Sequence, residues 1–95
     1  MVEKDNSRES SFLSEQNDVI GHEENFLTLH NDDIHTFDYV IESLMDVCEH
    51  STVQAEQCTF IIHYKGKCDV KKGSFDILKP MKDSLIDRGL NATIA

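Results

Sequence analysis

Several common features are missing from this chain, and each absence narrows what the protein can be. The sequence has no Trp, one Pro and no apolar run long enough to span a bilayer. Its first residues, MVEKD, lack the basic segment followed by an apolar one that marks a secreted precursor. The cysteines Cys48, Cys58 and Cys68 are odd in number and cannot all pair. Free thiols in a reducing compartment are the simplest account, so we expect a cytoplasmic protein without a membrane anchor.

Basic residues are also scarce. Nine Lys and Arg stand against eighteen Asp and Glu, for a net charge of -9. Binding to nucleic acid requires clustered Lys and Arg to neutralise phosphates, so the composition argues against it. Residues 1–24 hold seven acids and two bases, and their few apolar residues cannot offset the entropy of ordering. We therefore predict a disordered acidic extension over 1–24 and one small folded domain over 25–95.

The first half of that domain predicts a strand and two helices. Alternating apolar residues indicate a strand at Phe26–His30, and a three- to four-residue apolar repeat indicates a helix from about Thr36 to Glu49. Ser51 and Gln54 form a capping-box pattern at the start of a second helix. We expect that helix to run to about Tyr64, to end at a glycine, and to present these residues to its neighbours: Ala55, Cys58, Ile61 and Ile62.

The second half predicts strand, helix and strand. A short strand is expected at Cys68–Val70, followed by a turn at Lys72-Gly73. A third helix is indicated by Phe75, Leu78, Met81 and Leu85 and is closed by Arg88-Gly89; the last strand covers Leu90–Ile94. Pro80 allows two versions, a helix beginning near Lys79 after an irregular turn from Ser74, or a longer helix kinked at Pro80. The whole is an α+β domain, β-α-α-β-α-β, whose helices cover one face of a small sheet.

Three adjacent polar residues, Asn31, Asp32 and Asp33, follow the first strand directly. Their oxygen atoms suit an ammonium group, a metal ion or an exposed helix N-terminus, and a simple turn that caps the next helix is the plainer alternative. His63 lies near the end of the second helix, where a lone histidine is commonly a surface residue.

Two other chemistries are conceivable but poorly supported. Cys48, His50, Cys58 and His63 suggest a zinc site, yet the cysteines are ten residues apart and no C-x-x-C pair exists. An enzyme using His63 and Asp32 as an acid/base pair would need a nucleophile or cofactor motif, and neither is visible. We therefore expect no enzyme activity, no bound metal and no cofactor.

Taken together, these pieces resemble the ClpS family over residues 25–95. The resemblance rests on the strand that leads into Asn31-Asp32-Asp33, the helix start Phe37-Asp38-Tyr39-Val40, the segment His63-Tyr64-Lys65-Gly66-Lys67 and the final strand. It implies an antiparallel three-stranded sheet with three helices. It also implies a monomeric adaptor that binds free protein N-termini beginning with Phe, Tyr, Trp or Leu. Such proteins are delivered to a ClpA- or ClpC-type unfoldase and its peptidase, in the N-end rule pathway. A generic interaction domain of the same fold, without recognition of the amine, is the alternative.

The resemblance also implies roles for single residues. Asn31, Asp32 and His63 would bind the substrate's α-amino group, and Asp33 would add negative potential. The side-chain pocket would be lined by Val40, Ile62 and Leu90, together with Phe37 and Thr59, which stand where the family usually has Met and so bear on its shape. Asp76 matches an acidic contact with the unfoldase, whereas Met81 replaces a usual Lys. His35 occupies a position where the family often has a Thr or Asn helix cap, and Thr36 is expected to cap instead.

Overall fold

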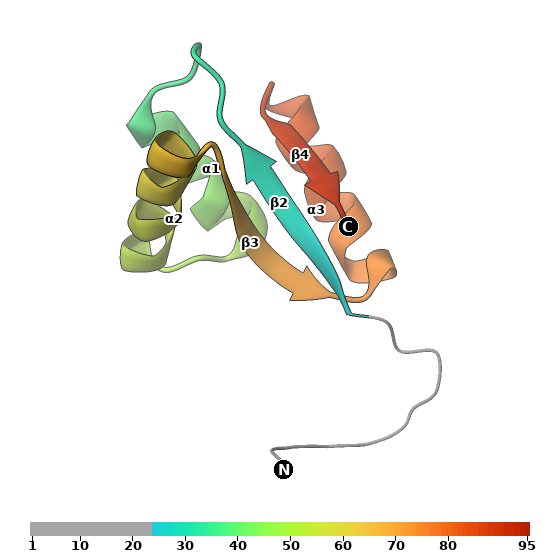
Figure 1. The fold of residues 1–95 in the computed structure, drawn as a ribbon. Coiled ribbons are helices and arrows are strands. Elements are labelled where there is room, and N and C mark those ends of the chain that lie inside the picture. The colour runs from blue at the N-terminus through green and yellow to red at the C-terminus, as the bar shows by residue number, and fades with distance from the viewer. Residues whose placement is uncertain (1–23) are drawn as a thin grey trace.

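A computed structural model describes residues 24–95 of the chain (Figure 1). The predicted extension over residues 1–24 therefore lies outside the described residues, apart from Glu24. Three strands and three helices follow one another in the order that the sequence predicted. They are β2 (Asn25–His30), α1 (Phe37–Cys48), α2 (Thr52–Lys65), β3 (Lys67–Gly73), α3 (Phe75–Asp87) and β4 (Asn91–Ile94).

The strands form one antiparallel sheet in the order β3-β2-β4, so the first strand lies in the centre. The helices lie on one side of the sheet, with α1 and α2 toward β3 and α3 behind β4 (Figure 1). Leu27 and Leu29 of β2 point into the core, where they meet Leu44, Leu78 and Leu85 from α1 and α3. The α+β architecture, with the helices covering one face, is confirmed.

Helix ends agree with the capping residues that the sequence predicted. The Thr36 hydroxyl accepts a hydrogen bond from the Tyr39 amide at 3.1 Å, so Thr36 caps α1 in place of His35. Ser51 accepts from the Gln54 amide at 3.1 Å; among residues 24–95, the Gln54 side chain does not return a bond to it. Gly66 ends α2 in the left-handed region with φ of 93°.

Strand β3 is longer than predicted, and the turn expected at Lys72-Gly73 is wrong. Both residues belong to the strand, where they pair with Phe26 and Asn25. The pairing shifts by one residue because Leu27 faces Lys71 whereas Thr28 faces Asp69, which leaves the intervening Val70 as a bulge. Pairing continues beyond this bulge, with the register offset by one residue, through Gly73.

Two expectations about the helices also need correction. In α2, Ile61 is exposed, and Thr59 is buried in its place along with Ala55 and Ile62. Helix α3 runs without interruption from Phe75 through Pro80, so the version that begins near Lys79 is wrong. A helix can continue past a proline, with one backbone hydrogen bond lost, when packing contacts keep the adjacent turns in place. Here Leu78 and Leu85 anchor α3 in the core on either side of Pro80.

No helix within residues 24–95 combines the length and the apolar character that a membrane crossing demands.

Candidate functional site

The pairing of the strands gathers distant segments at one end of the sheet. His30, the last residue of β2, faces Lys67 at the start of β3 and Asn91 at the start of β4. The loop after β2, the end of α2 and the turn before β4 must therefore meet at this end. The polar residues that follow His30 thus come next to segments more than thirty residues away in sequence.

A cavity of about 280 Å³ opens at this end of the molecule. All nine residues that the sequence assigned to the amine site and the side-chain pocket line it, together with four that were not assigned. The assigned residues are Asn31, Asp32, Asp33, Phe37, Val40, Thr59, Ile62, His63 and Leu90, and the others are Leu29, His30, His35 and Thr36.

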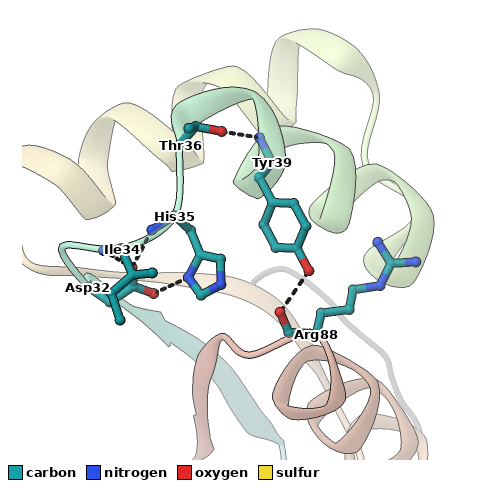
Figure 2. Close-up of polar contacts among 6 residues, drawn as sticks. All are labelled: Asp32, Ile34, His35, Thr36, Tyr39 and Arg88. Atoms are coloured by element: carbon teal, nitrogen blue, oxygen red, sulfur yellow. Dashed lines mark hydrogen bonds and ion pairs between the residues drawn. The ribbon is translucent and has the colours of Figure 1, made fainter.

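Asp32 is held by three hydrogen bonds from its own loop (Figure 2). Its Oδ1 accepts from the backbone amides of Ile34 and His35, both at 2.9 Å, and its Oδ2 accepts from His35 Nδ1 at 2.9 Å. Partial burial acts to raise the pKa of Asp32, but the bonds from His35 and Ile34 outweigh it, so the pKa lies below its ordinary value. The carboxylate is therefore ionised and fixed in direction. The plainer interpretation is correct in that Asp32 forms a turn, but the helix cap that it also expected is supplied by Thr36.

The His35 ring connects this carboxylate to Tyr39 of α1 and, through Tyr39, to Arg88 at the end of α3 (Figure 2). It stacks on Tyr39 with a centroid distance of 4.9 Å and an interplanar angle of 18°. The Tyr39 hydroxyl donates to the backbone carbonyl of Arg88 at 2.7 Å. Gly89 follows with φ of 84°, and a Cβ atom there would lie 3.2 Å from His35 Nε2. We call Asp32 and His35 the loop side of the cavity.

Asn31 is tied to the end of α2. Its backbone amide donates to the carbonyl of Gly66 at 2.8 Å, and Gly66 in turn donates to Ile62 within the last turn of the helix. This bond brings Asn31 near the helix end that carries His63. Among residues 24–95, the side chains of Asn31, Asp33 and His63 make no hydrogen bond or ion pair, so their polar atoms are available to a ligand.

Two aromatic rings, Phe37 and His63, line the other side of the cavity, and Phe60 and Tyr64 contact them from outside it. We call these four rings the helix side. Phe37 meets His63 edge-on at 5.0 Å and Phe60 edge-on at 5.4 Å. Tyr64 stacks on Phe60 at 6.2 Å and contacts His63 at 5.2 Å. Phe60, His63 and Tyr64 are exposed, so these rings are positioned by one another and little else.

The interior of the cavity is apolar. Ile62 and Leu90 are almost fully buried, and Val40 packs against the core beside them. Thr59 is also buried, and its hydroxyl donates to the Ala55 carbonyl one turn earlier at 2.7 Å. The hydroxyl is therefore already satisfied within α2, and the Thr59 side chain adds no free donor to the cavity.

The two histidines that flank Asp32 line the cavity but were not predicted as site residues. His30 lines the cavity, and its Nε2 lies 2.7 Å from Thr93 Oγ1 of β4. His35 was considered only as a poor helix cap, although its spacing of three residues from Asp32 was a usable signal. Asp76, the suggested docking residue, lies in the first turn of α3 and does not line the cavity.

The conceivable zinc ligands are in unlike surroundings. Cys48 and His50 are buried, and His50 Nε2 lies 2.6 Å from the Val70 carbonyl, whereas His63 is exposed. Within the part of the chain that the structure describes, no three potential metal ligands gather at one place. Burial raises the pKa of the Cys48 thiol to about 11, which keeps it protonated.

Comparisons with known proteins point in one direction. No curated protein matches the chain in sequence. The structure of Agrobacterium tumefaciens ClpS2 bound to L-phenylalaninamide is similar in fold, with a TM-score of 0.66 and 23% sequence identity; the match covers 76% of this chain and 94% of that chain. A family model described as ATP-dependent Clp protease adaptor protein ClpS matches residues 22–93, and the chain therefore belongs to the ClpS family.

Proposed function

We propose that this adaptor binds free protein N-termini whose first residue is bulky and apolar, and that it delivers those proteins to a Clp unfoldase and its peptidase. Asn31, Asp32 and His63 bind the α-amino group in this proposal, and Asp33 adds negative potential. The first side chain enters the apolar part of the cavity between Phe37, Val40, Thr59, Ile62 and Leu90.

One observation carries the proposal: a single cavity has polar acceptors at its mouth and an apolar interior. Asn31, Asp32 and His63 line the same 280 Å³ as Val40, Ile62 and Leu90. A ligand that satisfies both parts needs a hydrogen-bond donor within a few bonds of a bulky apolar group. The N-terminal residue of a protein has this combination in its ammonium group and side chain.

The acceptors match an ammonium group in charge and number. An ammonium has three donors, and an ionised carboxylate has about four acceptor positions. Asp32 already uses three of these positions within its loop, which leaves one for the ligand. The amide oxygen of Asn31 and a neutral His63 imidazole supply the other two acceptors. A bond between an ammonium and a carboxylate is about twice as strong as a neutral one.

The apolar interior supplies the second part of the recognition. Burying one large apolar side chain contributes about 1.5–3 kcal/mol of transfer free energy. L-phenylalaninamide, the ligand in the ClpS2 structure, joins a free amine to a benzyl side chain and carries an amide where a free amino acid has a carboxylate. It thus represents the first residue of a peptide, which supports the same class of ligand for this chain. Phe, Tyr, Trp and Leu are the first residues that we propose.

Delivery requires a second surface. We assign docking on the N-domain of a ClpA- or ClpC-type unfoldase to the region of Asp76, which lies in the first turn of α3 and outside the cavity. Residues 1–24, which apart from Glu24 lie outside the described residues, are assigned to handover of the substrate. The adaptor acts as a cytoplasmic monomer in this proposal and performs no catalysis itself.

A peptide series that varies only in residue one tests the proposal. Calorimetry or fluorescence anisotropy should give the highest affinity for free Phe, Tyr, Trp and Leu N-termini. Acetylation of the Phe peptide removes its charge and two of its donors and should abolish measurable binding. Equal affinity for the free and acetylated peptides would instead favour an interaction domain that does not read the amine.

A further inference from the structure

We propose that His35 is a positioning residue of the amine site, whose Nδ1–H holds Asp32 and whose charge state sets how strongly Asp32 attracts the ligand's ammonium group. This inference rests on the proposed function, which it extends from the residues that touch the amine to one that acts through Asp32. Three features of the structure carry it.

The first feature is the direction of the bond between His35 and Asp32. Asp32 is ionised and has no proton to give, so His35 Nδ1 must be the donor across their 2.9 Å contact. Thr36 already caps α1, so the His35 side chain is not needed at the helix end. The ring is therefore free to fix the carboxylate oxygen Oδ2, while the two backbone amides fix Oδ1.

The second feature is that the His35 ring is itself fixed from both sides. Tyr39 stacks on it, and the Tyr39 hydroxyl is anchored on the Arg88 carbonyl. Gly89 approaches so closely that a Cβ atom there would crowd His35 Nε2 at 3.2 Å. Ring orientation and the bond to Asp32 are thus set by contacts that reach from α1 to the turn before β4 (Figure 2). Leu90, the next residue along the chain, lines the apolar part of the cavity.

The third feature is the electrostatics around the ring. A neutral His35 leaves the full negative charge of Asp32 to attract an ammonium group, whereas a protonated His35 cancels that charge and repels the ligand. Arg88 presents its carbonyl to this cluster, and its guanidinium lies instead against Ser43 and Asp46 at 3.3–3.4 Å. The other ionisable groups that line the same cavity are Asp33, His30 and His63. Affinity should therefore fall as the pH drops through the range in which histidines titrate, about pH 5–8.

Two amide substitutions at this position separate positioning from packing. Asn in His35→Asn places its Nδ2 donor near the place of the histidine Nδ1, whereas Gln in His35→Gln places its donor near the place of Nε2. Neither amide titrates. At pH 7.5 a free Phe-initiated peptide should bind His35→Asn within about twofold of the unchanged protein. His35→Gln and His35→Ala should bind about tenfold more weakly, the lower end of what losing an outer hydrogen-bond partner costs in metal sites. Equal binding by all three variants would overturn the proposal.

The pH profile gives a second readout, measured in a His63→Ala background that removes the other histidine of the amine site. Peptide affinity of that variant should still fall between pH 7.5 and 5.5, and adding His35→Asn should flatten the fall. An unchanged fall in the double variant would show that His35 does not set the charge of the site. Thermal unfolding of each variant reports whether the domain remains folded.

A measurement without ligand keeps this inference separate from the proposed function. Carbon-detected NMR titration of the Asp32 carboxyl group in the free protein should show a higher pKa in His35→Ala than in the unchanged protein, and no rise in His35→Asn. That result would support the contact even if no peptide bound, in which case the proposed function would fail alone. A pKa of Asp32 that is the same in all variants would overturn the positioning role.

Discussion

The two sides of the cavity are held together by different forces. On the loop side, three hydrogen bonds fix the Asp32 carboxylate. The His35 ring stacks on Tyr39, whose hydroxyl donates to the Arg88 carbonyl. On the helix side, Phe37, Phe60, His63 and Tyr64 touch one another through their rings. Hydrogen bonds fix both distance and direction, whereas ring pairs accept a range of edge-on and offset arrangements. In the proposed function, Asp32 of the loop side and His63 of the helix side meet the ammonium group that every ligand shares, and Phe37 of the helix side meets the side chain that varies.

The largest effect should come from breaking the loop side. Among residues 24–95, Asp32 is the one carboxylate that lines the cavity and is fixed by hydrogen bonds. Asp32→Ala removes it, so affinity for a Phe-initiated peptide should fall by about 2 kcal/mol or more, roughly 30-fold. Asp33→Ala is the matched control: it removes the same charge from a neighbour that makes no hydrogen bond within the described region, and it should cost far less. Calorimetry on both variants decides the matter, with circular dichroism to verify folding. Similar losses in the two would show that overall negative charge, and not a positioned carboxylate, attracts the ligand.

His63→Ala should have the next largest effect, about 1 kcal/mol for one lost hydrogen bond from the ligand. It should also reduce the loss of affinity at acidic pH, since a neutral imidazole accepts a bond whereas an imidazolium repels the ammonium. Asp32 cannot cause that loss near neutrality, because the pKa of an ordinary aspartate already lies far below neutral pH and the bonds from His35 and Ile34 lower the pKa of Asp32 further. On the alkaline side, affinity should decline as the ligand's α-amino group, with a pKa of about 8, loses its proton.

The control for His63→Ala is Tyr64→Ala, which removes an exposed ring of the helix side that does not line the cavity. Peptide affinity measured from pH 5 to 9 should keep its full acid-side decline in this variant. If His63→Ala also kept the full decline, another histidine would be responsible, and His35 is the first candidate.

Phe37→Ala should change preference more than affinity. The ring lines the cavity and packs against Phe60 and His63, where we expect it to narrow the space for a side chain branched at Cβ. Its removal should cost a Phe-initiated peptide about 0.5–1.5 kcal/mol of ring contact and should improve binding of an Ile-initiated peptide. Phe60→Ala is the control, because Phe60 contacts Phe37 without lining the cavity. Should the Ile peptide gain nothing in Phe37→Ala, the helix side does not select side chains through Phe37.

The smallest effect on binding should follow deletion of residues 1–24. The residues of the described part that line the cavity lie between Leu29 and Leu90, so we expect peptide affinity to stay within about twofold. Degradation of a model substrate by the unfoldase and peptidase should stop, since those residues are assigned to handover. A large loss of affinity would mean that the comparison of the two sides omits a third contributor, and normal degradation would remove the handover role.

Local patterns in the sequence predicted most of the fold. Thr36, Ser51 and Gly66 mark helix ends through contacts within three or four residues, and the apolar repeat from Phe37 to Cys48 identifies α1. The errors arise where distant segments decide. Lys72 and Gly73 look like a turn, but they pair with Phe26 and Asn25 of β2, more than forty residues away. Ile61 has an apolar side chain of the kind found in cores, yet the packing of α2 buries Thr59 instead.

The candidate site shows the same division. The resemblance to a family supplied most of the residues that line the cavity. The roles of these residues remain predictions. The contact of His35 with Asp32 spans three residues and was within reach of sequence reasoning. The bond from Tyr39 to the Arg88 carbonyl spans 49 residues, and no periodicity predicts it. The surroundings of His35 therefore became visible only once α1 and the end of α3 were placed together.

The single bond from the Asn31 amide to the Gly66 carbonyl has a consequence for kinetics. This amide hydrogen can exchange with solvent only when the loop after β2 separates from the end of α2, and that separation would also pull Asn31 away from His63. The exchange rate of this amide therefore reports how often the cavity opens. A ligand that binds only the closed form should lower that exchange rate by a factor of about one plus the ratio of free ligand concentration to Kd. One backbone resonance would then report both how often the empty cavity opens and how tightly a peptide binds the closed form.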